Sequence, residues 1–346
     1  KVAQRIEDGQ YVVSKKVKGG KNIRASEAEA NLQREAAGEN ILPIYNTIRL
    51  ENALYHFMPL AGLGDGNAIS QKLSTVGRPE LATEVLKFIT KDLLTGLKTL
   101  HEKGIYHLDI KPDNFVFTKD GTGYITDFGC AKRSTLPQIS SNAIGDTRYY
   151  SPDRLQARRE STTFDGEKAD LWAAGVALLQ IIKNIDPHQL FEMPGQFALR
   201  VQKCNPEFFQ EKLKLIKELQ YPEEGSIWWV INSLLDSHSA TRFTAREALE
   251  APCFKGLNQP CKAVVFENLQ KETVARKTRV EKEEVDLSHY EEIAQALMKR
   301  EIPSIYESEQ HQQHYNMEDY EPVPTVTTGL GHYQAPPENP AASDYF

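Results

Sequence analysis

The sequence predicts an α+β fold in which strands gather in the first part of the chain and helices in the rest. Short runs of β-branched and aromatic residues at 11–15 and 53–58 are typical of strands. Between residues 81 and 102, apolar side chains recur at the spacing of a core helix. Residues 176–182 are nearly all apolar, as in a helix that is buried on every side. Strands followed by a run of helices favour this fold class.

The N-terminal region predicts a small β-rich unit with one helix. Gly and Asp residues mark the turn of its first hairpin, and a segment rich in Ala and Glu favours the helix. The expected elements are a hairpin at 1–23 with its turn at Glu7-Asp8-Gly9, a helix at 25–37, strands at 41–45 and 53–58, and an exit loop at 59–62.

The region after residue 81 predicts mostly helices. Beyond the long helix at 81–102 and the buried one that starts near Asp170, helical segments are expected at 197–219, 226–236, 245–250 and 266–300. After residue 302 the chain has many Pro, Gly, Gln and acidic residues and few aliphatic ones, which predicts disorder.

The stretch Tyr106–Gly129 presents four polar side chains in loops between predicted strands. They are Asp109, Lys111, Asn114 and Asp127. Two carboxylates, an amide and an ammonium group suit phosphoryl transfer assisted by a divalent metal. Carboxylate and amide oxygens are hard ligands for the metal. A further carboxylate can orient an incoming hydroxyl group and take its proton, and a fixed cation can stabilise the charge that develops.

These residues carry a resemblance to a known family. His107–Asn114, followed by Asp127-Phe128-Gly129, resembles the H-R-D-L-K-x-x-N and D-F-G motifs of eukaryotic-type serine/threonine protein kinases. The resemblance implies a two-lobed fold with a small β-rich N-lobe and a larger helical C-lobe. It further implies transfer of the γ-phosphoryl group of ATP to Ser/Thr hydroxyls of protein substrates. In that reaction Asp109 and Lys111 are catalytic, while Asn114 and Asp127 hold Mg²⁺.

A lysine and a glutamate of the N-terminal region resemble the nucleotide-binding pair of the family. Val12-Val13-Ser14-Lys15 is similar to the V-A-I-K strand, so Lys15 is expected to hold the ATP phosphates, and Glu29 is expected to pair with it. Lys16 is an adjacent competitor for the role of Lys15. Ser26-x-x-Glu29 also matches a capping box, in which Glu29 only satisfies a helix N-terminus. Both alternatives remain open from the sequence.

The segment 59–62 resembles the hinge between the lobes of the family. Backbone groups near Leu60 are expected to bond the adenine edge, and Met58 is expected at the back wall of the adenine site. A plain exit from strand to loop explains the same residues without a ligand.

The segment after Gly129 predicts flexibility followed by a docking surface. Residues 130–143 are rich in Ser and Thr, and 145–153 resembles the part of the family that docks the peptide substrate. The resemblance implies that Arg242 pairs with Asp153 and that Asp170 bonds backbone N–H groups of the catalytic loop.

Several positions depart from the family pattern. Leu108 replaces the usual Arg, and Gln33, Asp146 and Asp153 replace an apolar residue, Thr and Glu. Since the family's Arg binds a phosphate on the activation segment, which corresponds to residues 130–153 here, we expect activity not to depend on such a phosphate. The glycine-rich loop is expected upstream of Lys1. These departures favour an alternative, a pseudokinase or scaffold whose acidic tail recruits SH2-type partners.

Composition and charge limit the other functions. No apolar run reaches membrane-spanning length. The net charge of −7 resides largely in residues 301–346, which hold eight acidic residues and no Lys or Arg, so the tail gives no support for nucleic-acid binding. Four cysteines without C-x-x-C spacing predict reduced thiols and a cytoplasmic protein.

Three tail tyrosines suggest a second role for the C-terminal segment. Tyr306, Tyr320 and Tyr333 lie in acidic or Y-x-x-P contexts, which resemble phosphotyrosine ligands of SH2 domains. The alternative is that they are sticky residues in a spacer. The sequence thus divides into a kinase-like domain at 1–255, a charged helical extension at 256–301 and a disordered tail at 302–346.

Overall fold

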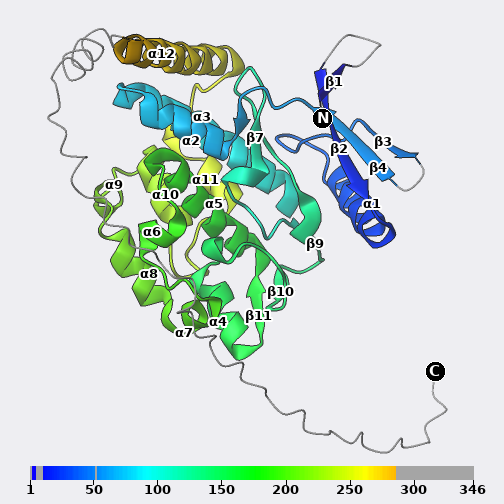
Figure 1. The fold of residues 1–346 in the computed structure, drawn as a ribbon. Helices are drawn as coiled ribbons and strands as arrows, with labels where there is room; N and C mark the ends of the chain where they lie inside the picture. The colour runs from blue at the N-terminus through cyan, green and yellow to red at the C-terminus, as the bar shows by residue number, and fades with distance from the viewer. Residues whose placement is uncertain (1, 5–10, 51–52, 286–346) are drawn as a thin grey trace, which may run out of the picture. The chain divides into compact units, whose positions relative to one another are not determined.

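The computed structural model describes residues 2–4, 11–50 and 53–285, and the statements below concern those residues (Figure 1). Several predictions lie outside them: the hairpin turn at Glu7-Asp8-Gly9, the end of the charged helix after residue 285, and the tail with Tyr306, Tyr320 and Tyr333.

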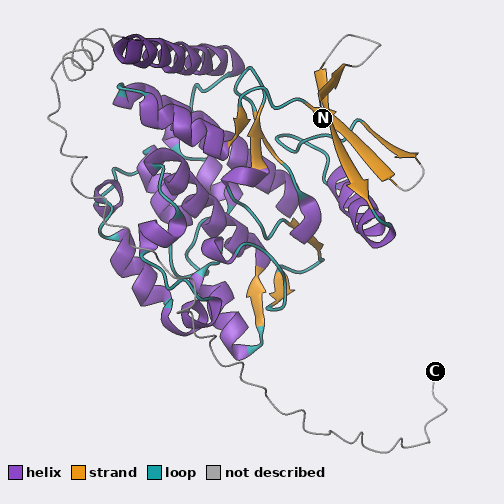
Figure 2. Cartoon of the chain, viewed as in Figure 1, coloured by secondary structure: helices purple, strands orange, loops and turns teal. Residues whose placement is uncertain are grey.

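A four-stranded antiparallel sheet and one helix form the N-terminal lobe. The strand order is β1-β2-β4-β3, and Figure 2 shows helix α1 beside this sheet. Strand β4 pairs with β2 and β3 along its length, so it lies inside the sheet. The elements are β1 (Val2–Gln4), β2 (Tyr11–Lys18), α1 (Gly20–Glu35), β3 (Asn46–Leu50) and β4 (Ala53–Pro59).

Helix α1 begins five residues earlier than the sequence predicts. Its N-cap is Gly19, which has a positive φ of 90°, a backbone conformation that glycine adopts most readily. Ser26 therefore lies inside the helix and cannot cap it, so the capping-box reading of Ser26 and Glu29 is wrong. The Ser26 hydroxyl instead forms a buried hydrogen bond of 2.8 Å with Nε2 of His56 on β4.

The strand predicted at 41–45 is also wrong. Only an isolated bridge joins Ile41 to Ile125. Leu42 donates its N–H to the carbonyl of Ile125, and Ile125 donates to the carbonyl of Asn40. Pro43 has no N–H to contribute to a ladder. Leu42 thus bonds to the helical lobe, while Tyr45 already donates its N–H to the carbonyl of Phe57 on β4, and strand β3 begins at Asn46.

Two long helices organise the C-terminal lobe. Helix α3 (Pro79–His101) confirms the predicted core helix, and the leucines along it are almost fully buried. Helix α5 (Gly166–Lys183) crosses the same core and is buried on nearly every side, as its apolar sequence predicts. Helix α2 (Gly66–Thr75) packs against α5 and is capped by the carboxylate of Asp65, which accepts from the N–H of Ala68 at 2.9 Å.

Short strands frame the stretch predicted to carry the chemistry. Three form one sheet, β5 (Gly64–Asp65), β7 (Phe115–Phe117) and β8 (Gly123–Ile125), and four more form two antiparallel pairs. One pair is β6 (Ile105–Tyr106) with β9 (Lys132–Arg133), and the other is β10 (Gln138–Ser140) with β11 (Thr163–Asp165). Within 130–143, the segment predicted to be flexible, β9 and β10 pair with β6 and β11 through backbone hydrogen bonds.

Shorter helices complete the lobe. The region 197–219 divides into three helices, because Pro206 cannot continue the first one and Asn205 caps the second by accepting from the N–H of Phe208. The helices are α4 (Pro152–Glu160), α6 (Pro187–Phe191), α7 (Phe197–Lys203), α8 (Pro206–Leu213), α9 (Lys217–Gln220), α10 (Ile227–Leu234) and α11 (Ala245–Leu249).

As far as the structure describes it, the charged extension forms helix α12 (Gln259–Val285), which begins earlier than predicted and packs on the C-lobe. The ammonium group of Lys262 forms a buried ion pair with Asp92 of α3, with distances of 2.7 and 2.8 Å to the two carboxylate oxygens. Phe266 is fully buried and stacks on Phe117 of β7. The first half of α12 thus supports the hairpin that carries the candidate site.

Candidate active site

The backbone of the loop at 106–114 is fixed by a buried carboxylate. Asp170 of α5 accepts hydrogen bonds of 2.7 Å from the N–H groups of both His107 and Leu108, as expected. The ring of His107 is fully buried, bonds the carbonyl of Thr126 at 3.0 Å through Nε2 and meets the Phe128 ring edge-on. Two segments that lie about twenty residues apart in the chain are therefore joined.

Asp109 is the centre of a hydrogen-bond network. Its Oδ2 accepts from Nζ of Lys111 at 2.8 Å and from Nδ2 of Asn114 at 3.0 Å. Its Oδ1 accepts from the backbone N–H of Asp146 at 2.6 Å. Asn114 donates to the Asp109 carbonyl as well, at 2.9 Å. The structure therefore brings three of the four predicted residues together, with Lys111 and Asn114 both bonded to the carboxylate of Asp109.

The charge of Lys111 is secured by its neighbours. Burial alone would lower the pKa of this lysine, but the hydrogen bond and attraction from Asp109 raise it overall above its usual value. The carboxylate of Asp146 adds to this effect from 3.9 Å. Lys111 thus presents a fixed positive charge beside Asp109.

Asp127 follows strand β8 in a left-handed conformation, with φ 66° and ψ 80°. This conformation is uncommon for a residue other than glycine and is concentrated at functional sites. Thr126, just before it, donates its N–H to the carbonyl of Asn114 at 3.0 Å. The end of β8 is thereby placed next to Asn114, as a shared metal site requires.

The side-chain oxygens of Asn114 and Asp127 are suited to a hard cation that also binds substrate phosphates. Among the described residues, no group of three or more His, Cys, Asp and Glu side chains could hold a metal by itself. Asn114 donates through its amide nitrogen, so its carbonyl oxygen is the atom suited to a metal. One carboxylate and one amide oxygen match Mg²⁺, which is usually held by few protein ligands together with substrate phosphates.

The structure distinguishes between the alternatives for the N-lobe lysine. Nζ of Lys15 lies 3.0 Å from Oε1 of Glu29. Lys16 points elsewhere, with its ammonium group 5.0 Å from the ring centroid of Tyr55. A cavity of about 30 Å³ borders both members of the Lys15–Glu29 pair as well as Met58 and Thr126. Met58 therefore lies at the wall of the same space, while Leu60 follows the end of β4 and is not among the lining residues.

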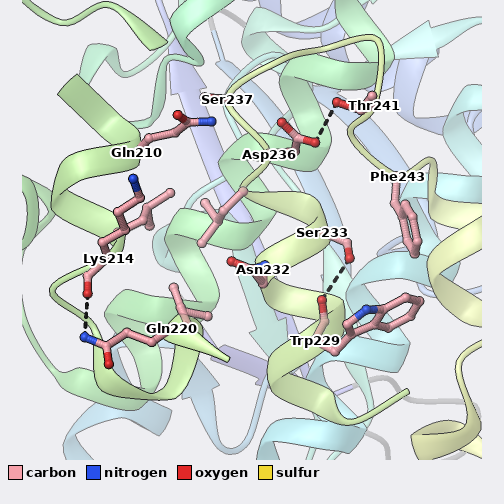
Figure 3. A pocket seen from close by; sticks show the side chains of 13 residues that line it. Gln210, Lys214, Gln220, Trp229, Asn232, Ser233, Asp236, Ser237, Thr241 and Phe243 are labelled. Carbon is pink, nitrogen blue, oxygen red and sulfur yellow. Dashed lines mark hydrogen bonds between the residues drawn. The ribbon is translucent and has the colours of Figure 1, made fainter. Parts of the chain in front are cut away.

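A larger cavity lies elsewhere in the C-lobe. It measures about 650 Å³ and opens between α8, α9, α10 and the loop after α10 (Figure 3). Polar groups in its walls already bond one another: Thr241 to Asp236 at 2.6 Å, and the Ser233 hydroxyl to the Trp229 carbonyl at 2.9 Å. It contains none of the residues that the sequence places in the site.

Comparison with known proteins agrees with this geometry. A family model described as the protein kinase domain matches residues 1–254. The chain belongs to the protein kinase family. It is 30% identical over 235 residues to a probable serine/threonine-protein kinase of Dictyostelium discoideum, covering 66% of this chain and 41% of the relative. It is 32% identical over 142 residues to mitogen-activated protein kinase kinase kinase 17 of Arabidopsis thaliana, covering 41% and 35%.

A third relative extends the comparison. CBL-interacting protein kinase 26 of Oryza sativa subsp. japonica is 24% identical over 235 residues, which is 65% of this chain and 46% of the relative. The chain therefore spans less than half the length of these curated relatives. Among the described residues, no helix is both long and apolar enough to cross a membrane.

The departures from the kinase pattern are compensated locally. Asp146, in place of Thr, accepts from the backbone N–H of Arg148 at 3.0 Å and pairs with its guanidinium group at 2.7 Å. Burial opposes the charge of this carboxylate, but the hydrogen bonds from Arg148 keep its pKa below the usual value. Arg148 also pairs with Asp186 at 2.7 Å. The charge introduced at position 146 is thus neutralised by Arg148 and lies beside Lys111.

The shorter carboxylate of Asp153 still reaches its partner. Nη2 of Arg242 lies 2.8 Å from Oδ1 of Asp153, and the other guanidinium nitrogens donate to the carbonyls of Asp236 and Lys168. The arginine side chain is fully buried. Oδ2 of Asp153 is buried without a hydrogen-bond partner. The implied pair therefore exists, with one oxygen left unsatisfied.

Two neighbours of the site, His56 and Arg154, were not identified from the sequence, and a third, Gln33, was noted there only as a departure from the family pattern. Gln33, where the family has an apolar residue, donates to the carbonyl of Leu42 at 2.7 Å and so ties α1 to the segment that reaches β8. His56 lines the same small cavity as Lys15 and Glu29, and burial followed by the charge of Lys15 lowers its pKa. Arg154 directly follows Ser151-Pro152-Asp153 in the sequence. Its positive charge was the only sequence signal that could have drawn attention to it.

Proposed function

We propose that this kinase domain transfers the γ-phosphoryl group of ATP to Ser/Thr hydroxyls of protein substrates. The network of Asp109 with Lys111, Asn114 and the N–H of Asp146 carries the proposal. It fixes both carboxylate oxygens by contacts of 2.6 to 3.0 Å. Phosphoryl transfer depends chiefly on positioning and on electrostatic stabilisation, so a pre-organised network of this kind is what the reaction needs.

Each residue of the network has a distinct task. Asp109 orients the acceptor hydroxyl and takes its proton. Lys111 stabilises charge on the transferring group. Asn114 and Asp127 would hold Mg²⁺, which neutralises phosphate charge when bound. Lys15, held by Glu29, positions the nucleotide phosphates.

The preference for Ser/Thr over Tyr rests on analogy with the family. Lys111 is followed by Pro112, and tyrosine kinases usually lack a lysine at that position. Relatives named as serine/threonine kinases support the same assignment. Phosphoamino-acid analysis of a generic protein substrate tests it, since phosphotyrosine as the main product would contradict it.

The test of activity separates chemistry from nucleotide binding. We expect Asp109→Asn to lower the rate of transfer by about 10²–10⁴-fold and to leave the thermal shift with ATP and Mg²⁺ nearly unchanged. Asp127→Asn should lose both phosphoryl transfer and the thermal shift with ATP and Mg²⁺. Asp113→Asn is the control, because its side chain is exposed in the same loop.

One outcome would favour the alternative function as a pseudokinase or scaffold. It is an equal thermal shift with ATP and Mg²⁺ in wild type and in Asp127→Asn, with no phosphoryl transfer by either protein. Binding would then not use the metal site, and the chain would act without catalysis.

A further inference from the structure

Leu108, the residue directly before Asp109, has an unusual backbone conformation. Leu108 has a positive φ of 65° and is only 2% exposed. Its side chain packs with Tyr106, Ile139 and Phe164 in a small apolar cluster. A non-glycine residue keeps such a conformation only where its surroundings impose it. Because Asp109 follows directly, whatever fixes the Leu108 carbonyl also fixes the start of Asp109.

One buried guanidinium group reaches that carbonyl. Nη1 of Arg154, on α4, donates to the Leu108 carbonyl at 3.0 Å. Its Nη2 donates to the carbonyls of Ala143 and Ile144 at 3.3 and 3.2 Å. Arg154 is 4% exposed, and its guanidinium carbon lies 3.6 Å from the ring centroid of Tyr150. The same side chain therefore joins the catalytic loop to the activation segment.

The two backbones also touch where Arg154 joins them. A Cβ atom at Gly145 would lie 2.2 Å from the Leu108 carbonyl oxygen, so only glycine fits. The next residue, Asp146, donates its N–H to Oδ1 of Asp109 at 2.6 Å. The contacts of Arg154 thus lie directly beside the bond that orients the catalytic carboxylate.

We propose that Arg154 is a positioning residue that locks the activation segment to the catalytic loop without a phosphate. This inference rests on the proposed function. Among the described residues, the hydrogen-bond acceptors of Arg154 are backbone carbonyls, its Nε is buried without a hydrogen-bond partner, and its guanidinium group lies over the face of the Tyr150 ring. These contacts join an arginine side chain to backbone carbonyls, so they form without phosphorylation of any residue.

Replacing Arg154 should impair turnover more than nucleotide binding. We expect Arg154→Ala to lower kcat by about 10- to 100-fold, the usual result of a small misplacement of a catalytic group, while KM for ATP stays near the wild-type value. Added guanidinium ion at millimolar concentration should restore part of kcat, because the substitution leaves a cavity of matching chemistry. Arg154→Lys keeps the charge without the fork and should retain an intermediate kcat with no gain from guanidinium.

Arg158→Ala is the matched control. Arg158 lies one turn further along α4 and bonds the carbonyl of Ser141 at 3.0 Å and the side chain of Asn142 at 2.9 Å. It makes no contact with the catalytic loop in these bonds. Its replacement should leave kcat unchanged, with or without guanidinium.

A second readout is independent of activity. Hydrogen exchange of the amides of Leu108 and Asp146 should accelerate in Arg154→Ala and Arg154→Lys but not in Arg158→Ala. If wild type transfers no phosphate, the proposed function fails while this readout still tests the lock. Unchanged exchange at both amides in the Arg154 variants, or an equal loss of kcat in Arg158→Ala, would overturn the proposal.

Discussion

The catalytic loop and the activation segment of this kinase differ in how closely their residues follow the family pattern. In the loop, the side chains that form the hydrogen-bond network are the ones the family pattern names: Asp109, Lys111 and Asn114, with Asp170 behind them. In the segment, Asp146 and Asp153 replace the usual residues, and the contacts are rebuilt with Arg148 and Arg242.

The difference reflects what each region must supply. The loop has to present particular atoms to the reacting groups, so the chemistry admits few substitutes. The segment has only to lie in the right place, and many combinations of hydrogen bonds can hold a backbone in place. Two short ladders, β6–β9 and β10–β11, do part of this work. Changes in the loop should therefore remove activity, while changes in the segment should remove stability or order.

The largest effect on stability is expected at the ion pair between Arg242 and Asp153, which anchors the end of the activation segment. Arg242→Met removes a fully buried guanidinium group and leaves the partly buried carboxylate of Asp153 without its partner, which should lower the free energy of unfolding by about 3–5 kcal/mol. Denaturant titration followed by fluorescence measures this change. Adding Asp153→Leu should recover part of the loss, since an apolar side chain needs no partner.

A surface pair provides the control for Arg242→Met. Arg246 is 68% exposed and pairs with Glu102, and exposed pairs of this kind contribute about 0–1 kcal/mol. Arg246→Met should therefore leave the midpoint nearly unchanged. If it destabilises the protein as much as Arg242→Met, burial is not what makes the anchor strong.

Much of the fold and of the site could be predicted from the sequence. The helices α3 and α5 follow from apolar spacing alone, because that spacing reports directly on burial. Asp109, Lys111, Asn114 and Asp127 were identified by their order along the chain, and the structure gathers the first three by direct hydrogen bonds. Local order predicts this site well because the loop is short and its polar groups bond one another.

What could not be predicted depends on contacts between distant segments. Ile41–Tyr45 is rich in apolar residues, yet the N–H of Leu42 bonds to Ile125 of β8, more than eighty residues later. Ser26 matches a helix cap, but the helix begins at Gly20 and has Gly19 as its N-cap. Residues 130–143 look like a loop by composition, and only the positions of β6 and β11 make them pair. In each case a tertiary contact outweighs a local signal.

The charge at Asp146 predicts a smaller effect that depends on pH. Hydrogen bonds from Arg148 lower the pKa of this carboxyl in the folded state. The resulting stability is therefore present above the unfolded pKa of about 3.9 and is lost as pH falls through the folded pKa. Asp146→Asn should lower stability at pH 7 by about 1–2 kcal/mol and flatten the decline below about pH 4.

Thermal unfolding between neutral and acid pH checks this prediction. Glu160→Gln, which changes an exposed carboxylate of α4, should give a curve parallel to that of wild type. If the curve of Asp146→Asn also runs parallel to wild type down to the lowest pH, the carboxylate of Asp146 does not stabilise the segment.

The smallest expected effect is that of a phosphate on the activation segment, and it concerns the same comparison. Between Cys130 and Arg148 the segment carries five Ser and Thr residues: Ser134, Thr135, Ser140, Ser141 and Thr147. Leu108 is buried and apolar, so it cannot bind a phosphate on any of them. Arg133 and Arg148 are the nearest substitutes in sequence, but Arg133 pairs with Glu35 at 2.8 Å, and Arg148 with Asp146 and Asp186.

We therefore expect phosphatase treatment to leave kcat within about twofold of the untreated value. Intact-mass measurement before and after treatment shows whether a phosphate was present, and replacement of the five hydroxyl residues by Ala should give the same kcat. A phosphate that bound Arg133 would have to displace Glu35 on α1, and one that bound Arg148 would have to displace two carboxylates. Activity that disappears with the phosphatase and returns on rephosphorylation of one mapped site would show that such a displacement occurs and that the segment is not held by its own atoms alone.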